Sequence, residues 1–177
     1  AVADILFGDY NPAGRLPVTF YRSIDDLPPF ENYDMDGRTY RYFGEEVLYP
    51  FGFGLSYTSF LYDNLILEKD EIGAEESVTV SVDVSNTGAM DGEEVVQLYL
   101  RYPDSKFKRP LKDLRGFERI DIKAGQSRVV TMELKPEDLS CFDPELGDYV
   151  VEAGSYEIML GPSSRDEGML VTALVVR

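Results

Sequence analysis

The chain changes character at residues 49–60, which read Tyr49-Pro50-Phe51-Gly52-Phe53-Gly54-Leu55-Ser56-Tyr57-Thr58-Ser59-Phe60. Aromatic residues occupy five of these twelve positions, and two glycines and a proline lie among them. Glycine permits positive φ and close backbone approach, while proline prevents a helix from continuing through this point. The stretch therefore predicts a rigid, irregular connector that packs aromatic rings against its neighbours.

After this stretch the sequence alternates in the manner of β-strands. Valines at 78, 80, 82 and 84 are separated by polar residues, a pattern typical of a half-buried strand. Seven or eight short strands separated by turn residues indicate an antiparallel sandwich of immunoglobulin-like kind, so we expect a mainly β fold. The strands that we expect are Phe60–Glu68, Val78–Val84, Glu94–Tyr102, Leu114–Ile122, Arg128–Leu134, Leu139–Phe142, Ser155–Leu160 and Met169–Val176.

Before the stretch the sequence predicts a short helix, a strand and a long connector. Ala1–Phe7 has helical apolar spacing, Leu16–Phe20 alternates like a strand, and Tyr21–Leu48 shows no sustained period. We therefore divide the chain into three parts: residues 1–22 as the terminal helix and strand of a truncated α/β layer, residues 23–57 as a connector, and residues 58–177 as the sandwich. An apolar remnant of this kind must fold back on the sandwich or pack on a neighbouring chain.

Composition excludes several classes of function. The 177 residues include 17 basic and 33 acidic ones, and the resulting charge of −16 disfavours nucleic acid and anionic membrane surfaces as partners. No apolar run is long enough to span a bilayer, and no signal-peptide pattern is present. The absence of histidine argues against Ser-His-Asp and Cys-His nucleophiles and most transition-metal sites. We expect no cofactor, and we expect the lone Cys141 to be a small buried side chain.

Several motifs resemble one family in its own order. Residues 3–20, from Ala3-Asp4-Ile5 to Val18-Thr19-Phe20, resemble the closing helix and strand of the α/β sandwich domain in family-three glycoside hydrolases, the β-glucosidases and β-xylosidases. Residues 38–42 and 49–58 resemble the start of that family's C-terminal fibronectin type III-like domain. The match continues through Val84–Gly88, Gly92–Tyr99, Arg109–Phe117 and Gly154–Asp166.

The resemblance implies a parent protein that hydrolyses β-glucosides or β-xylosides with retention of configuration, through a carboxylate nucleophile and a second acid/base carboxylate. The family's nucleophile stands in a Ser-Asp-Trp motif, and this chain contains no tryptophan. Its acid/base glutamate lies upstream of Ala1. No catalytic, cofactor or metal residue is therefore transferred, and we expect the chain alone to be inactive. The location stays open, although a periplasmic or secreted parent would fit.

Two groups of residues are candidates for interdomain or sugar-proximal contacts. Aromatic faces pack on pyranose rings and arginine donates to hydroxyls, but the same residues can also hold the connector against its neighbours. Residues 102–113 form a basic loop that either approaches the active site of the parent or is a solvated or interdomain loop, and we expect it to appear as an isolated positive patch. The candidate contacts are Arg38, Tyr40, Arg41, Tyr42, Lys108 and Arg109, with Lys106 and Lys112 in the same loop.

Other acidic clusters have simpler interpretations. Asn32–Gly37 imitates the start of a calcium-binding loop, yet Phe43 stands where the bidentate carboxylate should be. We interpret the adjacent acidic pairs Glu93-Glu94, Glu45-Glu46 and Asp25-Asp26 as solvated surface rather than as an acid/base pair.

Two hypotheses for the function of this chain remain. In the first, it is a structural accessory portion, and its partners are the upstream catalytic domains of the same parent protein. A β-linked oligosaccharide would be contacted through that parent. We also expect possible self-association through residues 1–22. In the second, the sandwich is an independent carbohydrate-binding module, with Tyr99, Tyr102, Tyr149 and Tyr156 in place of the usual tryptophans. Alternation suggests that several of these tyrosines face inward.

Overall fold

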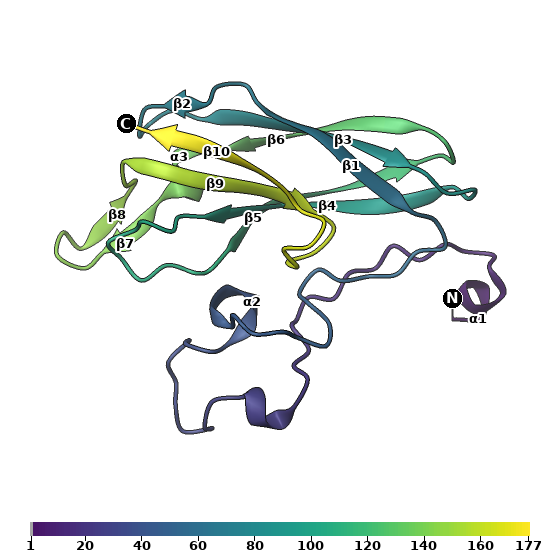
Figure 1. Ribbon diagram of the computed structural model, residues 1–177, viewed down its shortest axis with the longest axis horizontal. Helices are drawn as coiled ribbons and strands as arrows, with labels where there is room; N and C mark the ends of the chain where they lie inside the picture. Colours follow the sequence, from purple (N-terminus) through teal and green to yellow (C-terminus); the bar gives the residue numbers. More distant parts are fainter. Residues whose placement is uncertain (1) are drawn as a thin grey trace.

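The computed structural model describes residues 2–177, so Ala1, the first residue of the expected N-terminal helix, lies outside the described residues. Two β-sheets face each other, and residues 2–57 run along one side of them (Figure 1). The expected sandwich is confirmed. The described part of the chain has no helix long and apolar enough to cross a membrane.

The larger sheet has five strands in the order β2-β10-β9-β4-β5. Its neighbours are antiparallel except at one edge, where the two-residue β2 pairs in parallel with β10 through Val175 to Glu71 and Val176 to Ile72. The strands are β2 (Glu71–Ile72), β4 (Gly92–Arg101), β5 (Asp113–Ile122), β9 (Gly154–Gly161) and β10 (Leu170–Val176).

The smaller sheet has three antiparallel strands in the order β1-β3-β6. In β3 the buried and partly buried positions alternate without interruption, as the valine spacing predicts. A separate two-stranded hairpin closes one end of the sandwich. These strands are β1 (Phe60–Leu67), β3 (Val78–Asn86), β6 (Ser127–Leu134), β7 (Cys141–Asp143) and β8 (Asp148–Val150).

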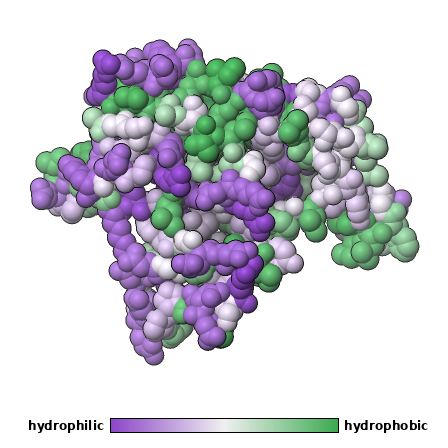
Figure 2. Space-filling model, viewed as in Figure 1, coloured by the Kyte–Doolittle hydropathy of each residue, from purple (hydrophilic) through white to green (hydrophobic). Residues whose placement is uncertain are grey.

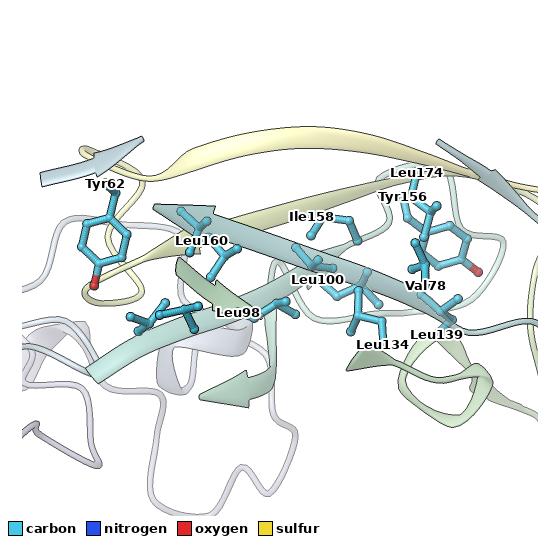
Figure 3. Close-up of a cluster of buried hydrophobic side chains, with 14 of the residues drawn as sticks. Tyr62, Val78, Leu98, Leu100, Leu134, Leu139, Tyr156, Ile158, Leu160 and Leu174 are labelled. Carbon is cyan, nitrogen blue, oxygen red and sulfur yellow. The ribbon is translucent and has the colours of Figure 1, made fainter. Parts of the chain in front are cut away.

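The core lies between the two sheets. Figure 3 shows side chains from β3 and β6 meeting those from β4, β9 and β10 across this space. Tyr156 and Ile158 are fully buried, and Tyr62 closes one end of the layer with its hydroxyl turned to the rim. This burial of apolar area supplies the main stabilisation of the sandwich.

Residues 11–20 run beside the aromatic-glycine stretch. Leu16 N–H donates to Phe53 O over 2.8 Å, and Gly52 N–H donates to Leu16 O over 2.8 Å. The strand expected at Leu16–Phe20 is wrong, because pairing there is limited to one isolated bridge between Phe20 and Tyr49. Pro17 has no N–H with which to extend a ladder.

The N-terminal helix α1 (Val2–Phe7) buries no side chain. The side chains of Val2, Leu6 and Phe7 are all largely exposed, and Figure 2 shows hydrophobic residues gathered at the edge where α1 lies. The segment after α1 folds back, and α1 itself is linked to the aromatic-glycine stretch by the Tyr57 hydroxyl, which donates to Ile5 O over 2.6 Å. Packing of α1 on a neighbouring chain stays a prediction.

The connector contains two short helices that its aperiodic sequence does not predict. The 3-10 helix η1 (Ile24–Asp26) is capped by Ser23, and α2 (Thr39–Tyr42) lies under the larger sheet (Figure 1). Between them the chain projects away from the sandwich with Phe30 and Tyr33 exposed.

Two local expectations need correction, and two short strands are absent from the expected set. The strand expected at Leu139–Phe142 begins only at Cys141, because Pro136 at the first helical turn starts helix α3 (Pro136–Leu139). Strands β2 and β8 are too short to show an alternating pattern. Cys141 is partly exposed rather than buried.

Candidate functional site: the joint between the N-terminal segment and the sandwich

Gln97 connects the aromatic-glycine stretch to the sandwich. Its buried side chain donates from Nε2 to Gly52 O over 3.2 Å and to Pro162 O over 2.6 Å, while Oε1 accepts from the Tyr99 hydroxyl over 2.6 Å. Gly52 has a φ of 78°, and a Cβ atom there would lie 2.0 Å from Gln97 Oε1. Only glycine allows this conformation and this close approach together.

Aromatic rings continue the joint on both sides of Gly52. Phe51 stacks on Tyr40 with ring centroids 4.3 Å apart, and Tyr40 meets the edge of Tyr99 at 5.9 Å. Burial raises the pKa of the Tyr40 hydroxyl, which accepts a hydrogen bond from the Leu114 N–H over 3.2 Å. The rings pack the connector against β4, and the hydrogen bond from the Leu114 N–H connects it to β5.

A buried ion pair connects Arg15 to β4, the strand that also carries Gln97. Arg15 Nη2 lies 2.8 Å from Glu94 Oε1, and the Glu94 side chain is 3% exposed. The Tyr62 hydroxyl also donates to Glu94 Oε1 over 3.1 Å. Burial, followed by the Glu94 charge, raises the pKa of Tyr62 far above its ordinary value. The expectation that Glu94 belongs to a solvated acidic surface is therefore wrong.

Asn11 holds the end of the stretch. Its Oδ1 accepts from Ser56 Oγ over 2.9 Å and from Tyr57 N–H over 2.8 Å, while its Nδ2 donates to Asp91 O over 2.9 Å. One amide side chain therefore joins the N-terminal segment, the stretch and the turn before β4. Asn86 has a similar role nearby, accepting from Thr58 Oγ1 over 2.5 Å.

The candidate residues of α2 lie at the joint, although they do not form one group. Arg38 points back into the connector, where it donates to Asn32 O over 2.5 Å and Asp34 O over 3.1 Å. Arg41 instead reaches the sandwich, with Nη2 2.9 Å from Asp113 Oδ2 and its guanidinium over the Tyr42 ring at 5.9 Å.

Lys108 and Arg109 point to different partners. Lys108 Nζ lies 3.0 Å from Asp34 and 2.7 Å from Asp36, which fastens the connector to the basic loop. The buried Arg109 lies 3.2 Å from Glu152. Its guanidinium also lies over the stacked rings of Tyr102 and Tyr156, at 5.2 and 5.6 Å.

The basic loop is not an isolated positive patch. The ammonium group of Lys112 binds Ser164 O and the Asp166 carboxylate, and Lys106 lies 4.0 Å from Asp143. Each cation that suggested the patch has an acidic partner, because segments distant in sequence bring carboxylates to the loop. Where the sequence imitates a calcium loop, Asp34 and Asp36 bind Lys108. Residues 2–177 hold no group of three or more acidic, cysteine or histidine side chains arranged for a metal.

Sequence reasoning missed the polar residues that complete the joint. Gln97 interrupts the apolar run of β4, and Asn86 ends the alternating run of β3 at a buried position. An uncharged polar residue at a core position of a strand is the signal that could have identified them, because such residues stay buried only when they are hydrogen-bonded.

Two family models match this arrangement. Residues 1–57 match the glycosyl hydrolase family 3 C-terminal domain, and residues 94–164 match the fibronectin type III-like domain. The chain belongs to glycosyl hydrolase family 3. It corresponds to the C-terminal part of family 3 proteins, in which the end of the α/β sandwich domain is followed by the fibronectin type III-like domain.

Similar proteins support the family assignment. The chain is 48% identical over 172 residues to a xylan 1,4-beta-xylosidase of Xylanibacter ruminicola, covering 96% of this chain and 19% of that protein. It is 38% identical to a periplasmic beta-glucosidase of Salmonella typhimurium, covering 93% and 23% of the two chains.

Solved structures of β-glucosidases superpose on nearly the whole chain. The β-glucosidase of Erythrobacter marinus matches with a TM-score of 0.86 and 41% identity, covering 99% of this chain and 23% of that one. The GH3 β-glucosidase of Bifidobacterium adolescentis matches with a TM-score of 0.86 and 34% identity, covering 98% and 27%. The chain thus spans about a fifth to a quarter of the length of these relatives.

Proposed function

We propose that this chain is the accessory, domain-bracing portion of a retaining glycoside hydrolase that acts on β-glucosides or β-xylosides. The observation that carries the proposal is the joint itself: residues 11–16 and 49–57 are bound to each other and to β4 by hydrogen bonds and a buried ion pair. A segment held this firmly can transmit a fixed orientation from the sandwich to whatever precedes it.

Exposed apolar residues support the bracing role. Leu6 and Phe7 on α1 and Phe30 and Tyr33 on the connector lie on the N-terminal part of the chain and have little cover. In the proposed parent, the upstream catalytic domains cover these side chains. The proposed division into residues 1–22, 23–57 and 58–177 places all four before the sandwich.

The chain contributes no catalytic residue in this proposal. A retaining glycosidase needs two carboxylates about 5 Å apart in a cleft that accepts the sugar. The buried Glu94 is already paired with Arg15, and Glu93 is paired with Arg119. The binding-module alternative has less support, because Tyr99, Tyr102 and Tyr156 are buried and Tyr149 alone of the four is exposed.

The test compares the 177-residue chain with the longer protein on nitrophenyl β-glucoside and β-xyloside. We expect turnover by the longer protein alone. In that protein, Gln97→Leu should lower the midpoint of thermal inactivation, while Lys123→Leu on the exposed β5–β6 turn should leave it unchanged. Turnover by the 177-residue chain that depends on one of its own carboxylates would overturn the proposal.

A further inference from the structure

A hollow of 300 Å³ opens where α2, the β4–β5 loop and the β7–β8 hairpin meet on the lower side of the sandwich in Figure 1. This volume is at the small end of the range for ligand sites and accommodates one monosaccharide-sized molecule. Its wall carries more positive than negative side chains in a chain of net charge −16. The cations are Arg41, Lys108, Arg109 and Arg115, and the carboxylates are Asp113 and Glu137.

The cations of the wall differ in how their charges are paired. Lys108 and Arg109 are neutralised by carboxylates outside the wall, as described above. Arg41 and Arg115 share a single partner, with Nη2 of each lying 2.9 Å from Asp113 Oδ2. Two guanidinium groups therefore share one carboxylate, and Glu137 is the other carboxylate of the wall. We call Arg41, Arg115 and Asp113 the arginine fork.

The arginine fork also has hydrogen-bond donors to spare. A guanidinium carries five N–H groups. Within residues 2–177, the ion pair with Asp113 is the polar side-chain contact that each guanidinium makes, and Nε of both Arg41 and Arg115 has no hydrogen-bond partner. Both Nε atoms are buried, whereas the two side chains as a whole are 40% and 25% exposed, so a ligand would contact the remaining terminal nitrogens rather than Nε.

Aromatic residues form another part of the wall. Phe142 in β7 and Tyr149 in β8 are register partners, and their rings meet edge to face at 5.6 Å. Both side chains are more than half exposed although both line the hollow. Exposed aromatic faces beside a cationic group suit a molecule with one ring and one negative group.

We propose that this hollow binds a pyranose that bears a carboxylate, which is the chemistry of a uronic acid. The carboxylate binds the outer nitrogens of the arginine fork, and the sugar ring packs against Phe142 and Tyr149. The Asp113 and Glu137 carboxylates in the wall repel a dianion such as phosphate more strongly than a monoanion. The site belongs to this chain and does not depend on the proposed bracing role.

The experiment is calorimetric titration of the full 177-residue chain with methyl β-D-glucuronide, methyl β-D-glucoside and sodium acetate at low ionic strength. The glucoside lacks the carboxylate and acetate lacks the ring, so each removes one half of the proposed recognition. We expect the glucuronide to bind at least about tenfold more tightly than either, as one charge-assisted contact implies.

Variants locate the site. Arg115→Gln should weaken glucuronide binding about tenfold, and Tyr149→Ala should weaken it several-fold without altering any charge. Arg128→Gln is the matched control, because Arg128 is an exposed arginine on β6, away from the hollow. A thermal unfolding curve for each variant verifies that it is folded, and Arg41→Gln replaces Arg115→Gln if the latter unfolds.

Four results would overturn the proposal. They are the absence of glucuronide binding, equal binding of glucuronide and glucoside, equal binding of glucuronide and acetate, and glucuronide binding that survives both arginine substitutions.

Discussion

Arg15 and Glu94, 79 residues apart in sequence, form an ion pair of 2.8 Å that is almost entirely buried. Glu94 Oε1 also accepts from the Tyr62 hydroxyl and the Val95 N–H, so the carboxylate is held on several sides. A charge this deep depends on its partners, because removing it from water is otherwise costly.

Arg15→Met should therefore destabilise the protein by about 3 kcal/mol, since it leaves the Glu94 carboxylate buried without its cation. Urea unfolding measures the change. The matched control is Arg22→Met, which removes an exposed pair with Glu46 and should cost less than about 1 kcal/mol. Adding Glu94→Gln to Arg15→Met should recover part of the loss. Equal effects of the Arg15 and Arg22 substitutions would contradict the buried-pair account.

Gly52→Ala should release the connector from the sandwich. Its positive φ costs a side chain about 1 to 2 kcal/mol, and the added Cβ atom displaces Gln97 from its hydrogen bonds. Gly125→Ala is the matched control, because Gly125 has a φ of 71° with no atom within 4 Å of the Cβ position. We expect faster proteolysis within residues 43–57 for Gly52→Ala alone. Equal cleavage of both variants would show that backbone strain, rather than the contact with Gln97, decides the effect.

The contact of Lys108 with Asp34 and Asp36 should open at both extremes of pH. The Asp36 backbone N–H and then Lys108 hold the pKa of Asp34 below its ordinary value, so its contribution is present above pH 3.8 and is lost as pH falls further. The carboxylates of Asp36 and then Asp34 raise the pKa of Lys108, so its contribution is complete below pH 10.5 and is lost as pH rises further.

Amide hydrogen exchange across residues 30–37 measures this opening. Protection should be constant in the intermediate pH range, after correction for the intrinsic exchange rate, and should fall with added salt because all three side chains are exposed. Lys108→Met should remove the salt dependence. Persistent salt dependence in that variant would assign the attachment of the connector to other groups.

Buried tyrosines should resist alkaline titration. Burial raises the pKa of Tyr156 to about 12, although the nearby Arg109 opposes the shift. A neutral acid with a raised folded-state pKa stabilises the fold fully below its ordinary pKa of 10 and loses that contribution as pH rises through the folded value. Ultraviolet absorbance should therefore show a late tyrosinate phase that decreases in Tyr156→Phe. A single tyrosinate phase near pH 10 in a chain that is still folded would contradict this expectation.

The sequence predicts the sandwich well because each of its long strands buries at least one face. The valines of β3 mark that face directly, and the expected strands from Phe60 to Val176 correspond to all the long strands of the two sheets. Short strands are not predicted in this way, because they contain too few residues to show an alternating pattern. The two residues of β2 form a strand only because β10 passes beside them, a tertiary effect that no local period records.

The sequence predicts where the candidate site lies but not which side chains pair with each other there. The glycines and aromatics at residues 49–60 indicate a rigid connector, and Gly52 meets that expectation. The basic loop fails as a predicted patch because Glu152 and Asp166, which neutralise two of its cations, arrive from a different part of the chain. Local sequence reports the charge of a residue but not the charge that the fold places beside it.

The two hydrogen bonds of Gln97 Nε2 imply an order of assembly. The side chain binds Gly52 O on the connector and Pro162 O in the loop after β9, so its position is defined only after β4 and β9 have paired. We therefore expect the connector to dock last during refolding. Pulse-labelling hydrogen exchange would show this as late protection of the Gly52 and Phe53 amides after that of β4, and simultaneous protection would refute it. During synthesis, the N-terminal segment would therefore leave the ribosome first but would reach its final position only after the sandwich has folded.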